Sequence, residues 1–318
     1  MADLRGKRVW VAGHRGLVGS ALVRRLERGS IGTLITAGSL EVDLRRQAET
    51  EAFVDAMNPE IVIVAAAVVG GIQANRTAQG RFLYDNLMIS ANVIEAARRH
   101  GVEKLVALGS SCIYPREAPQ PMKESALLTG PLEPTNEGYA IAKIAALEMT
   151  KMYRRQYGMN AISLMPTNLY GPGDNFDPES SHVLASLLRK IHEASVSGAP
   201  TVQVWGSGTP RREFLHVDDL ADATVLAIEH YEGEQHLNVG TGQDISIRDL
   251  AALIAEVVGW SGRFVFDTEM PDGTPRKLLD VSALQRLGWA GASIGLRDGV
   301  RTTYEWFLAH EAEAIASR

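Results

Sequence analysis

Short, mostly apolar runs alternate with segments of helical spacing through the first half of this 318-residue chain. The runs expected to form strands lie at 8–13, 33–37, 61–67, 104–110 and 160–166. The segments expected to form helices lie at 20–28, 47–57, 86–101 and 139–158. Strands that are apolar throughout are buried on both faces, so the pattern predicts a parallel sheet covered by helices on either side. With right-handed connections, the expected fold class is α/β with a doubly wound parallel sheet.

The rhythm changes after Leu169, where glycine, proline and aspartate crowd the stretch YGPGDNFDPESS. The later segments are mixed, and no linker of low complexity separates them from the first half. We therefore expect a smaller α/β region that is interleaved with the larger domain. The larger domain is assigned residues 1–170, with returning segments near 212–246 and 280–318, and the smaller substrate-binding region is assigned residues 171–211 and 247–279.

Composition excludes several classes of partner. The net charge is −6 without a block of like charge, so we expect no nucleic-acid partner and no membrane partner, since both favour a basic surface. The longest apolar run, 61–69, is far shorter than the roughly 20 residues of a membrane helix. A single cysteine forms no internal disulfide, and the first strand follows the N-terminus too closely for a signal peptide. We expect a cytoplasmic protein without a bound metal.

A glycine-rich loop lies between the first expected strand and the first expected helix. Its sequence GHRGLVGS has the spacing G-x-x-G-x-x-G, which lets the backbone approach a pyrophosphate at the start of a helix. A plain tight turn is the alternative. In this position we interpret the loop as a dinucleotide site of a Rossmann-type domain. Its expected cofactor-binding residues are Gly13, His14, Arg15, Gly16, Leu17, Val18 and Gly19.

The choice between NAD and NADP depends on the end of the second strand. An acidic residue there binds the ribose hydroxyl of NAD, and a basic one accepts the phosphate of NADP. Residues 37–41 read AGSLE and place neither kind at the expected point. Arg15 is within reach of a 2′-phosphate, and a solvated loop arginine is an equal alternative.

Tyr139 and Lys143 are four residues apart at the start of an expected helix, so they share one face. A nearby ammonium favours the phenolate, so we expect Lys143 to lower the pKa of Tyr139 and make it an acid or base near neutral pH. Ser110 follows the fourth strand, at the edge where such sheets bind ligands. The tyrosine–lysine spacing is common by chance, but with the glycine loop and the serine it predicts an oxidoreductase site.

These features together resemble the extended short-chain dehydrogenase/reductase family, whose members use such a serine, tyrosine and lysine with NAD(P). The stretches LGSSCIYP, PLEPTNEGYAIAK, MPTNLYGPGDNF, VWGSGTPRREFLHVDDLA, LNVGTG and PDGTPRKLLDVS follow one another along nearly the whole chain. They are similar to the members of this family that act on GDP-4-keto sugars.

The resemblance implies a bifunctional enzyme, a 3,5-epimerase and NADPH-dependent 4-reductase that converts GDP-4-keto-6-deoxy-D-mannose to GDP-L-fucose. Alternatives are an enzyme acting on another GDP-4-keto sugar, a nucleotide-sugar 4-epimerase or dehydratase, and a non-catalytic NAD(P)-binding regulator. The implied cofactor is NADP(H), although the arginines that often follow the second strand in the family are absent here. The family is usually dimeric, which implies a homodimer that pairs long helices such as 139–158.

By the same resemblance, Cys112 and His182 invert the two carbons that flank the ketone, with Cys112 as the base and His182 as the acid. A thiol with a pKa of about 8.5 and an imidazole with one of about 6.5 both exchange protons near neutral pH. A small buried side chain is the alternative role for Cys112, and a helix-end histidine for His182.

The remaining site residues are also implied by the resemblance. Further cofactor-binding positions are Asp43, Leu44, Leu108, Gly109, Ser110, Ser111, Tyr139, Lys143, Pro166, Thr167, Asn168, Leu169 and His182. Substrate-binding positions are Lys190, Trp205, Arg212, Asp272 and Lys277. Arg212 suits phosphate oxygens through its planar guanidinium, and Trp205 suits packing on the sugar or base. A solvated helix face is the alternative for Lys190.

Overall fold

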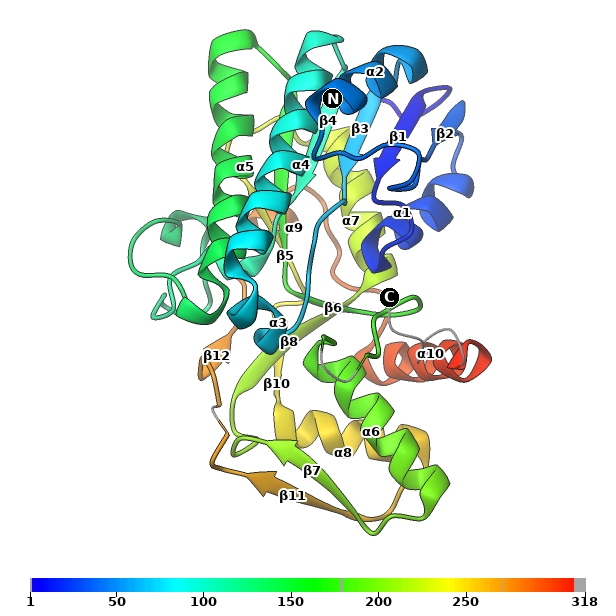
Figure 1. Cartoon of the computed structure of the whole chain (residues 1–318), viewed down its shortest axis with the longest axis vertical. Coiled ribbons are helices and arrows are strands. Elements are labelled where there is room, and N and C mark those ends of the chain that lie inside the picture. Colours follow the sequence, from blue (N-terminus) through cyan, green and yellow to red (C-terminus); the bar gives the residue numbers. More distant parts are fainter. Residues whose placement is uncertain (1, 178–179, 271, 312–318) are drawn as a thin grey trace.

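A computed structural model describes residues 2–177, 180–270 and 272–311. Its largest sheet has six parallel strands in the order β2-β1-β3-β4-β5-β9 (Figure 1). The strands are β1 (Arg8–Ala12), β2 (Thr33–Ile35), β3 (Ile61–Val64), β4 (Lys104–Leu108), β5 (Ala161–Pro166) and β9 (Leu237–Val239). The expected α/β fold with a doubly wound parallel sheet is confirmed.

Helices cover both faces of this sheet. Successive side chains of a strand point to opposite faces, so each strand contributes to the apolar layers on both sides. Val9 and Val11 of β1 pack with α1 and α7, whereas Trp10 and Ala12 pack in the cluster that includes residues of α2, α4 and α5. These helices are α1 (Leu17–Glu27), α2 (Gln47–Met57), α4 (Gln79–Arg99), α5 (Glu137–Tyr157) and α7 (Val217–His230). The short helix α3 (Ile72–Thr77) precedes α4, and α9 (Ser282–Arg286) lies beside β9. The carboxyl ends of the strands point toward the smaller region (Figure 1).

The smaller region is built from two short sheets and three helices. One sheet joins β6 (Asn168–Tyr170), β8 (Arg211–His216), β10 (Asp244–Ser246) and β12 (Arg276–Lys277), and the other pairs β7 (Thr201–Trp205) with β11 (Arg263–Asp267). One apolar cluster is formed by buried side chains of the helices α6 (Val183–Ser197), α8 (Ile247–Val258) and α10 (Leu296–Ala309). Figure 1 shows β6 and β8 running between the two halves of the molecule.

Four elements lie in a different half from the one that the sequence suggested, namely β6, β8, β10 and α10. Strand β8 pairs with β6, β10 and β12, and not with the large sheet. Helix α10 buries Val300 and Phe307 in the cluster of α6 and α8, although residues 280–318 were assigned to the larger domain. An apolar stripe shows that a helix is buried on one side but does not identify its partner. Segment 212–246 is therefore divided between the two halves, since β9 is a strand of the large sheet and α7 packs against that sheet.

None of the helices in the described part of the chain combines the length and the hydropathy needed to cross a bilayer.

Candidate active site

The glycine loop joins β1 to α1 in a shape that requires glycine at two positions. Gly13 has a φ of 88°, and a Cβ there would lie 2.6 Å from the backbone of Ala66. A Cβ on Gly19 would lie 2.0 Å from the carbonyl oxygen of Gly13, so α1 packs directly on the loop. Among the described residues, no side chain caps the start of α1 at Gly16. The free N–H groups and the positive end of the helix dipole fit a pyrophosphate.

Arg15 extends from this loop to Gly38, three residues beyond the end of β2. Its guanidinium carbon lies 3.1 Å from the position that a Cβ on Gly38 would take, so the absence of a side chain there makes room for it. The N–H of Gly38 donates to the Glu41 carboxylate at 2.6 Å, which holds the turn. Arg15, whose side chain is exposed, thus lies beside residues 37–39, which carry no cation, and its role as a phosphate ligand stays a prediction.

Lys143 and Tyr139 both lie on the first turns of α5, against the end of β4. The Lys143 ammonium is buried, donates to the carbonyl oxygen of Leu108 at 2.9 Å, and lies 5.7 Å from the centre of the Tyr139 ring. Burial lowers the pKa of Lys143 to about 8. Lys143 therefore remains largely charged at neutral pH, close to the tyrosine.

The expected lowering of the Tyr139 pKa is wrong. Burial raises the pKa of Tyr139 above its ordinary value, and the charge of a Cys112 thiolate would raise it further. Lys143 does not reverse this, because its ammonium is hydrogen-bonded to Leu108 and lies over the ring. Tyr139 thus holds its proton near neutral pH, which suits a proton donor better than a base.

Cys112 lies in a short 3₁₀ turn (Ser111–Ile113) that follows β4, and its N–H donates to the Ser110 hydroxyl at 3.4 Å. The side chain is buried, with 6% of its surface exposed. Burial raises the pKa of the thiol, while the Ser110 hydroxyl and the ammonium groups of Lys277 and Lys143 act in the opposite direction. The structure therefore brings Ser110, Cys112, Tyr139, Lys143 and Lys277 into one electrostatic neighbourhood.

His182 precedes the first turn of α6 and remains exposed to solvent, yet the protein atoms around it lower the pKa of its imidazole. The segment before it is held against the loop after β3, because the Gly71 N–H donates to the Ser180 oxygen at 2.7 Å. Within the described residues, no hydrogen bond joins His182 to Cys112.

Arg212 and Lys277 are direct cross-strand partners, since β8 and β12 pair in parallel with these residues in register. Burial lowers the pKa of both, and the Arg212 charge further lowers the pKa of Lys277. Two half-buried cations side by side repel each other unless an anion lies between or above them. A diphosphate meets this requirement, because its oxygens accept bidentate hydrogen bonds from a guanidinium.

The other three expected substrate residues lie on neighbouring elements. Lys190 of α6 places its ammonium 5.5 Å from the centre of the Trp205 ring, which is 58% exposed at the end of β7. The Asp272 carboxylate accepts hydrogen bonds from the N–H and hydroxyl of Ser207, at 2.6 and 2.8 Å. Asp272 therefore fixes the turn after Trp205, and its charge raises the pKa of Arg212 against the effect of burial.

The remaining expected cofactor residues follow β2, β4 and β5 in the chain. Asp43 forms an ion pair with Arg45 at 2.9 Å, and the Leu44 oxygen accepts from Asn92. Gly109 packs on Met165, Pro166 ends β5, and the Thr167 N–H donates to Val239. Residues 166–169 thus lead directly from the large sheet into β6.

Sequence reasoning missed two residues of this region. Gly38 could have been found, because a glycine shortly after the second strand leaves room for a side chain from the glycine loop. Glu213 could not, because nothing in the stretch PRREFLHVDD indicates that one of its acidic residues is fully buried.

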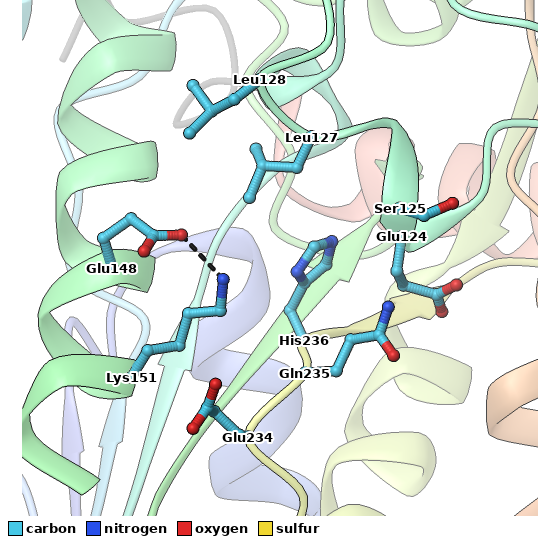
Figure 2. Close-up of a pocket in the computed structure, with 9 residues that line it drawn as sticks. All are labelled: Glu124, Ser125, Leu127, Leu128, Glu148, Lys151, Glu234, Gln235 and His236. Atoms are coloured by element: carbon cyan, nitrogen blue, oxygen red, sulfur yellow. Dashed lines mark hydrogen bonds and ion pairs between the residues drawn. The ribbon is translucent and has the colours of Figure 1, made fainter. Parts of the chain in front are cut away.

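A separate hollow of about 340 Å³ lies on another part of the surface (Figure 2). It is lined by Glu124, Ser125, Leu127, Leu128, Glu148, Lys151, Glu234, Gln235 and His236. Lys151 and Glu148 form an ion pair at 2.8 Å on its wall. None of the expected site residues lines this hollow, so we place the candidate active site at the strand ends described above.

Comparisons with known proteins find relatives over nearly the whole chain. Residues 9–240 match the model of the NAD dependent epimerase/dehydratase family. The chain is 56% identical to GDP-L-fucose synthase 1 of Arabidopsis thaliana, over 97% of this chain and 95% of that protein. It is 52% identical to the GDP-L-fucose synthase of Escherichia coli (strain K12), over 96% of this chain and 98% of that protein.

Among solved structures, the chain is similar to a GDP-mannoheptose C4 reductase from Campylobacter jejuni with NADP bound. The sequences are 35% identical and the TM-score is 0.87, over 97% of this chain and all of the other. The similarity therefore extends through both the large sheet and the smaller region.

Proposed function

The chain belongs to the NAD dependent epimerase/dehydratase family, and we propose that within it the protein is a GDP-sugar 3,5-epimerase and NADPH-dependent 4-reductase. It converts GDP-4-keto-6-deoxy-D-mannose to GDP-L-fucose. The observation that carries this proposal is the identity above 50%, over nearly the whole of both chains, to GDP-L-fucose synthases of a plant and a bacterium. The family resemblance seen in the sequence and the site geometry point the same way.

The cofactor is NADP(H), which a solved relative at 35% identity carries. The glycine loop, the uncapped start of α1 and Arg15 beside Gly38 are the groups that would hold its pyrophosphate and 2′-phosphate. Bound NADPH supplies the hydride that reduces C4. Lys143 and residues 166–169 would line its nicotinamide end.

The side chains at the strand ends then perform two kinds of proton chemistry. Ser110 and Tyr139 donate hydrogen bonds to the C4 carbonyl oxygen, which stabilises the negative charge of each enolate. Cys112 removes a proton next to the ketone from one face, and His182 returns a proton to the opposite face, at C3 and then at C5. When C4 is reduced, Tyr139 gives its proton to the new alkoxide, and the Lys143 ammonium favours the phenolate that remains.

The nucleotide end of the substrate meets the cations of the smaller region. Arg212 and Lys277 lie side by side and neutralise the diphosphate, while Trp205 packs on the sugar or base. Lys190 lies beside Trp205, and Asp272 lies near Arg212, at the same nucleotide end of the site. Another GDP-4-keto sugar would meet the same residues, and the name of the solved relative describes such a substrate.

The reaction itself tests this proposal. Purified protein incubated with GDP-4-keto-6-deoxy-D-mannose and NADPH should consume NADPH and yield GDP-L-fucose, identified by nuclear magnetic resonance of the sugar. A product with unchanged configuration at C3 and C5 would indicate a 4-reductase alone. No consumption of NADPH with this substrate, but turnover of another GDP-4-keto sugar, would shift the proposal to that sugar.

We also propose that the protein is a cytoplasmic homodimer that pairs α4 and α5 with their copies. The two helices pack against each other and carry five large apolar side chains that are exposed in the single chain: Tyr84, Leu87, Ile141, Met152 and Tyr157. Ile141→Glu should shift the protein from dimer to monomer in light scattering, because the glutamate would be buried in the contact. Val196→Glu, at an exposed apolar position of α6, is the matched control and should leave the mass unchanged. A wild-type protein that is monomeric at micromolar concentration would contradict the proposal.

A further inference from the structure

We propose that Glu213 is a positioning residue, whose buried carboxylate fixes the spacing of the two cations that receive the diphosphate of the substrate. This inference rests on the proposed function, because it concerns the same GDP-sugar site. Glu213 follows Arg212 in β8 and has no exposed surface. Side chains alternate along a strand, so the carboxylate and the Arg212 guanidinium leave β8 on opposite faces.

The carboxylate is held by three backbone N–H groups. One oxygen accepts from Thr241 and Gly242, both at 2.7 Å, and the other accepts from Leu279 at 2.9 Å. In the described part of the chain, Glu213 has no ion-pair partner. Gly240 makes room for it, because a Cβ there would lie 2.3 Å from a carboxylate oxygen.

These bonds join the strand of Arg212 to the segment that carries Lys277. Strand β12 contains only Arg276 and Lys277, so its own pairing with β8 is short. Two residues later the Leu279 N–H is bonded to Glu213, while Met122 bonds the flanking residues from the other side. Lys277 thus keeps its register beside Arg212 because Leu279 is anchored.

The backbone of Glu213 reaches the other side of the site. Its carbonyl oxygen accepts from the Asn168 side chain at 2.7 Å and from the Thr167 hydroxyl at 3.3 Å. These residues belong to the segment expected beside the nicotinamide. Glu213 therefore connects the segment expected beside the nicotinamide with both cations. Its backbone bonds Thr167 and Asn168, and its side chain bonds Leu279, two residues after Lys277.

A carboxylate is required here for a chemical reason. Both of its oxygens only accept hydrogen bonds, and four donors face them: the three N–H groups and, at 3.4 Å, the Thr241 hydroxyl. A glutamine in the same place would turn an NH₂ group toward at least one N–H, which replaces a hydrogen bond by a repulsion between donors. Burial raises the pKa of Glu213, and the N–H groups of Leu279, Gly242 and Thr241 oppose that shift. Burying a charge without a cationic partner is costly, so a neutral side chain would serve if packing alone mattered.

The test compares Glu213→Gln with Glu124→Gln. Glu124 is also a buried glutamate, and it accepts one backbone N–H, that of Asn238, at 3.1 Å. We expect Glu213→Gln to weaken GDP binding about tenfold, measured by calorimetry, which corresponds to roughly 1.4 kcal/mol. KM for the GDP-sugar should rise by a similar factor, kcat should change less, and NADPH affinity should be unchanged. Glu124→Gln should lower the thermal midpoint without changing GDP affinity.

A second variant keeps the test informative if Glu213→Gln does not fold. Gly240→Ala keeps the charge but pushes the carboxylate away from its donors, and should weaken GDP binding in the same direction by a smaller factor. GDP affinity equal to that of the wild type in both variants, or an equal loss in Glu124→Gln, would overturn the inference while the proposed function stands. A wild-type protein that binds no GDP would overturn both.

Discussion

The substitution Tyr139→Phe should lower kcat for reduction of the ketone by about a thousand-fold, within the range for loss of a general acid. Tyr139 is the residue placed to protonate the alkoxide, and its raised pKa means that the proton is present at neutral pH. Removing the hydroxyl also removes a hydrogen bond to the carbonyl oxygen, so the enolates are destabilised and epimerisation slows as well. The measurement is NADPH consumption in single turnover, with NADPH affinity followed separately and expected to be unchanged.

Tyr153→Phe is the matched control for this variant. Tyr153 lies on the same helix, α5, and donates to Glu95 at 2.9 Å, away from the strand ends. It should retain wild-type kcat with only a small loss of stability. In the wild-type protein, reduction should slow as the pH rises through about 8, because Lys143 then loses the charge that favours the Tyr139 phenolate. A Tyr139→Phe variant that reduces the ketone at the wild-type rate would remove the tyrosine from the mechanism.

The parts of the site that could be predicted from the sequence depend on local spacing. The glycine loop lies between β1 and α1 because a strand, a tight turn and a helix follow one another within 20 residues. Tyr139 and Lys143 lie on one helix because their separation matches its period. The apolar strands of the large sheet were predicted for the same reason, since each carries its signal within a few residues.

The parts that could not be predicted depend on pairing between distant segments. The register of β8 and β12 places Arg212 beside Lys277, although 65 positions separate them in the chain. Strand β6, only three residues long, is hidden in a stretch rich in glycine and proline. The pKa of Tyr139 was misjudged because spacing identifies a neighbouring charge but not the depth of burial, and burial decides the direction here. Glu213 was missed because its donors come from two loops far along the chain.

The substitution Cys112→Ser should slow epimerisation about a thousand-fold, because a hydroxyl does not ionise in the pH range where a thiol does. The sensitive measurement is deuterium uptake from heavy water at C3 and C5 of the substrate, since it reports each proton removal before reduction. Burial raises the pKa of Cys112, whereas the ammonium groups of Lys277 and Lys143 favour its thiolate, so these two cations support the proton removal that burial opposes. NADPH and GDP affinity should be unchanged, which serves as the control for folding.

His182→Gln separates the two proton-transfer roles. If Cys112 is the base and His182 the acid, the glutamine variant still removes protons, but Cys112 returns them to the same face. Deuterium should then enter the substrate without inversion, whereas Cys112→Ser should show neither uptake nor inversion. The reverse pattern, with uptake in Cys112→Ser and none in His182→Gln, would exchange the two roles. Wild-type uptake and inversion in both variants would show that neither group moves the protons, and the two-face mechanism would have to be abandoned.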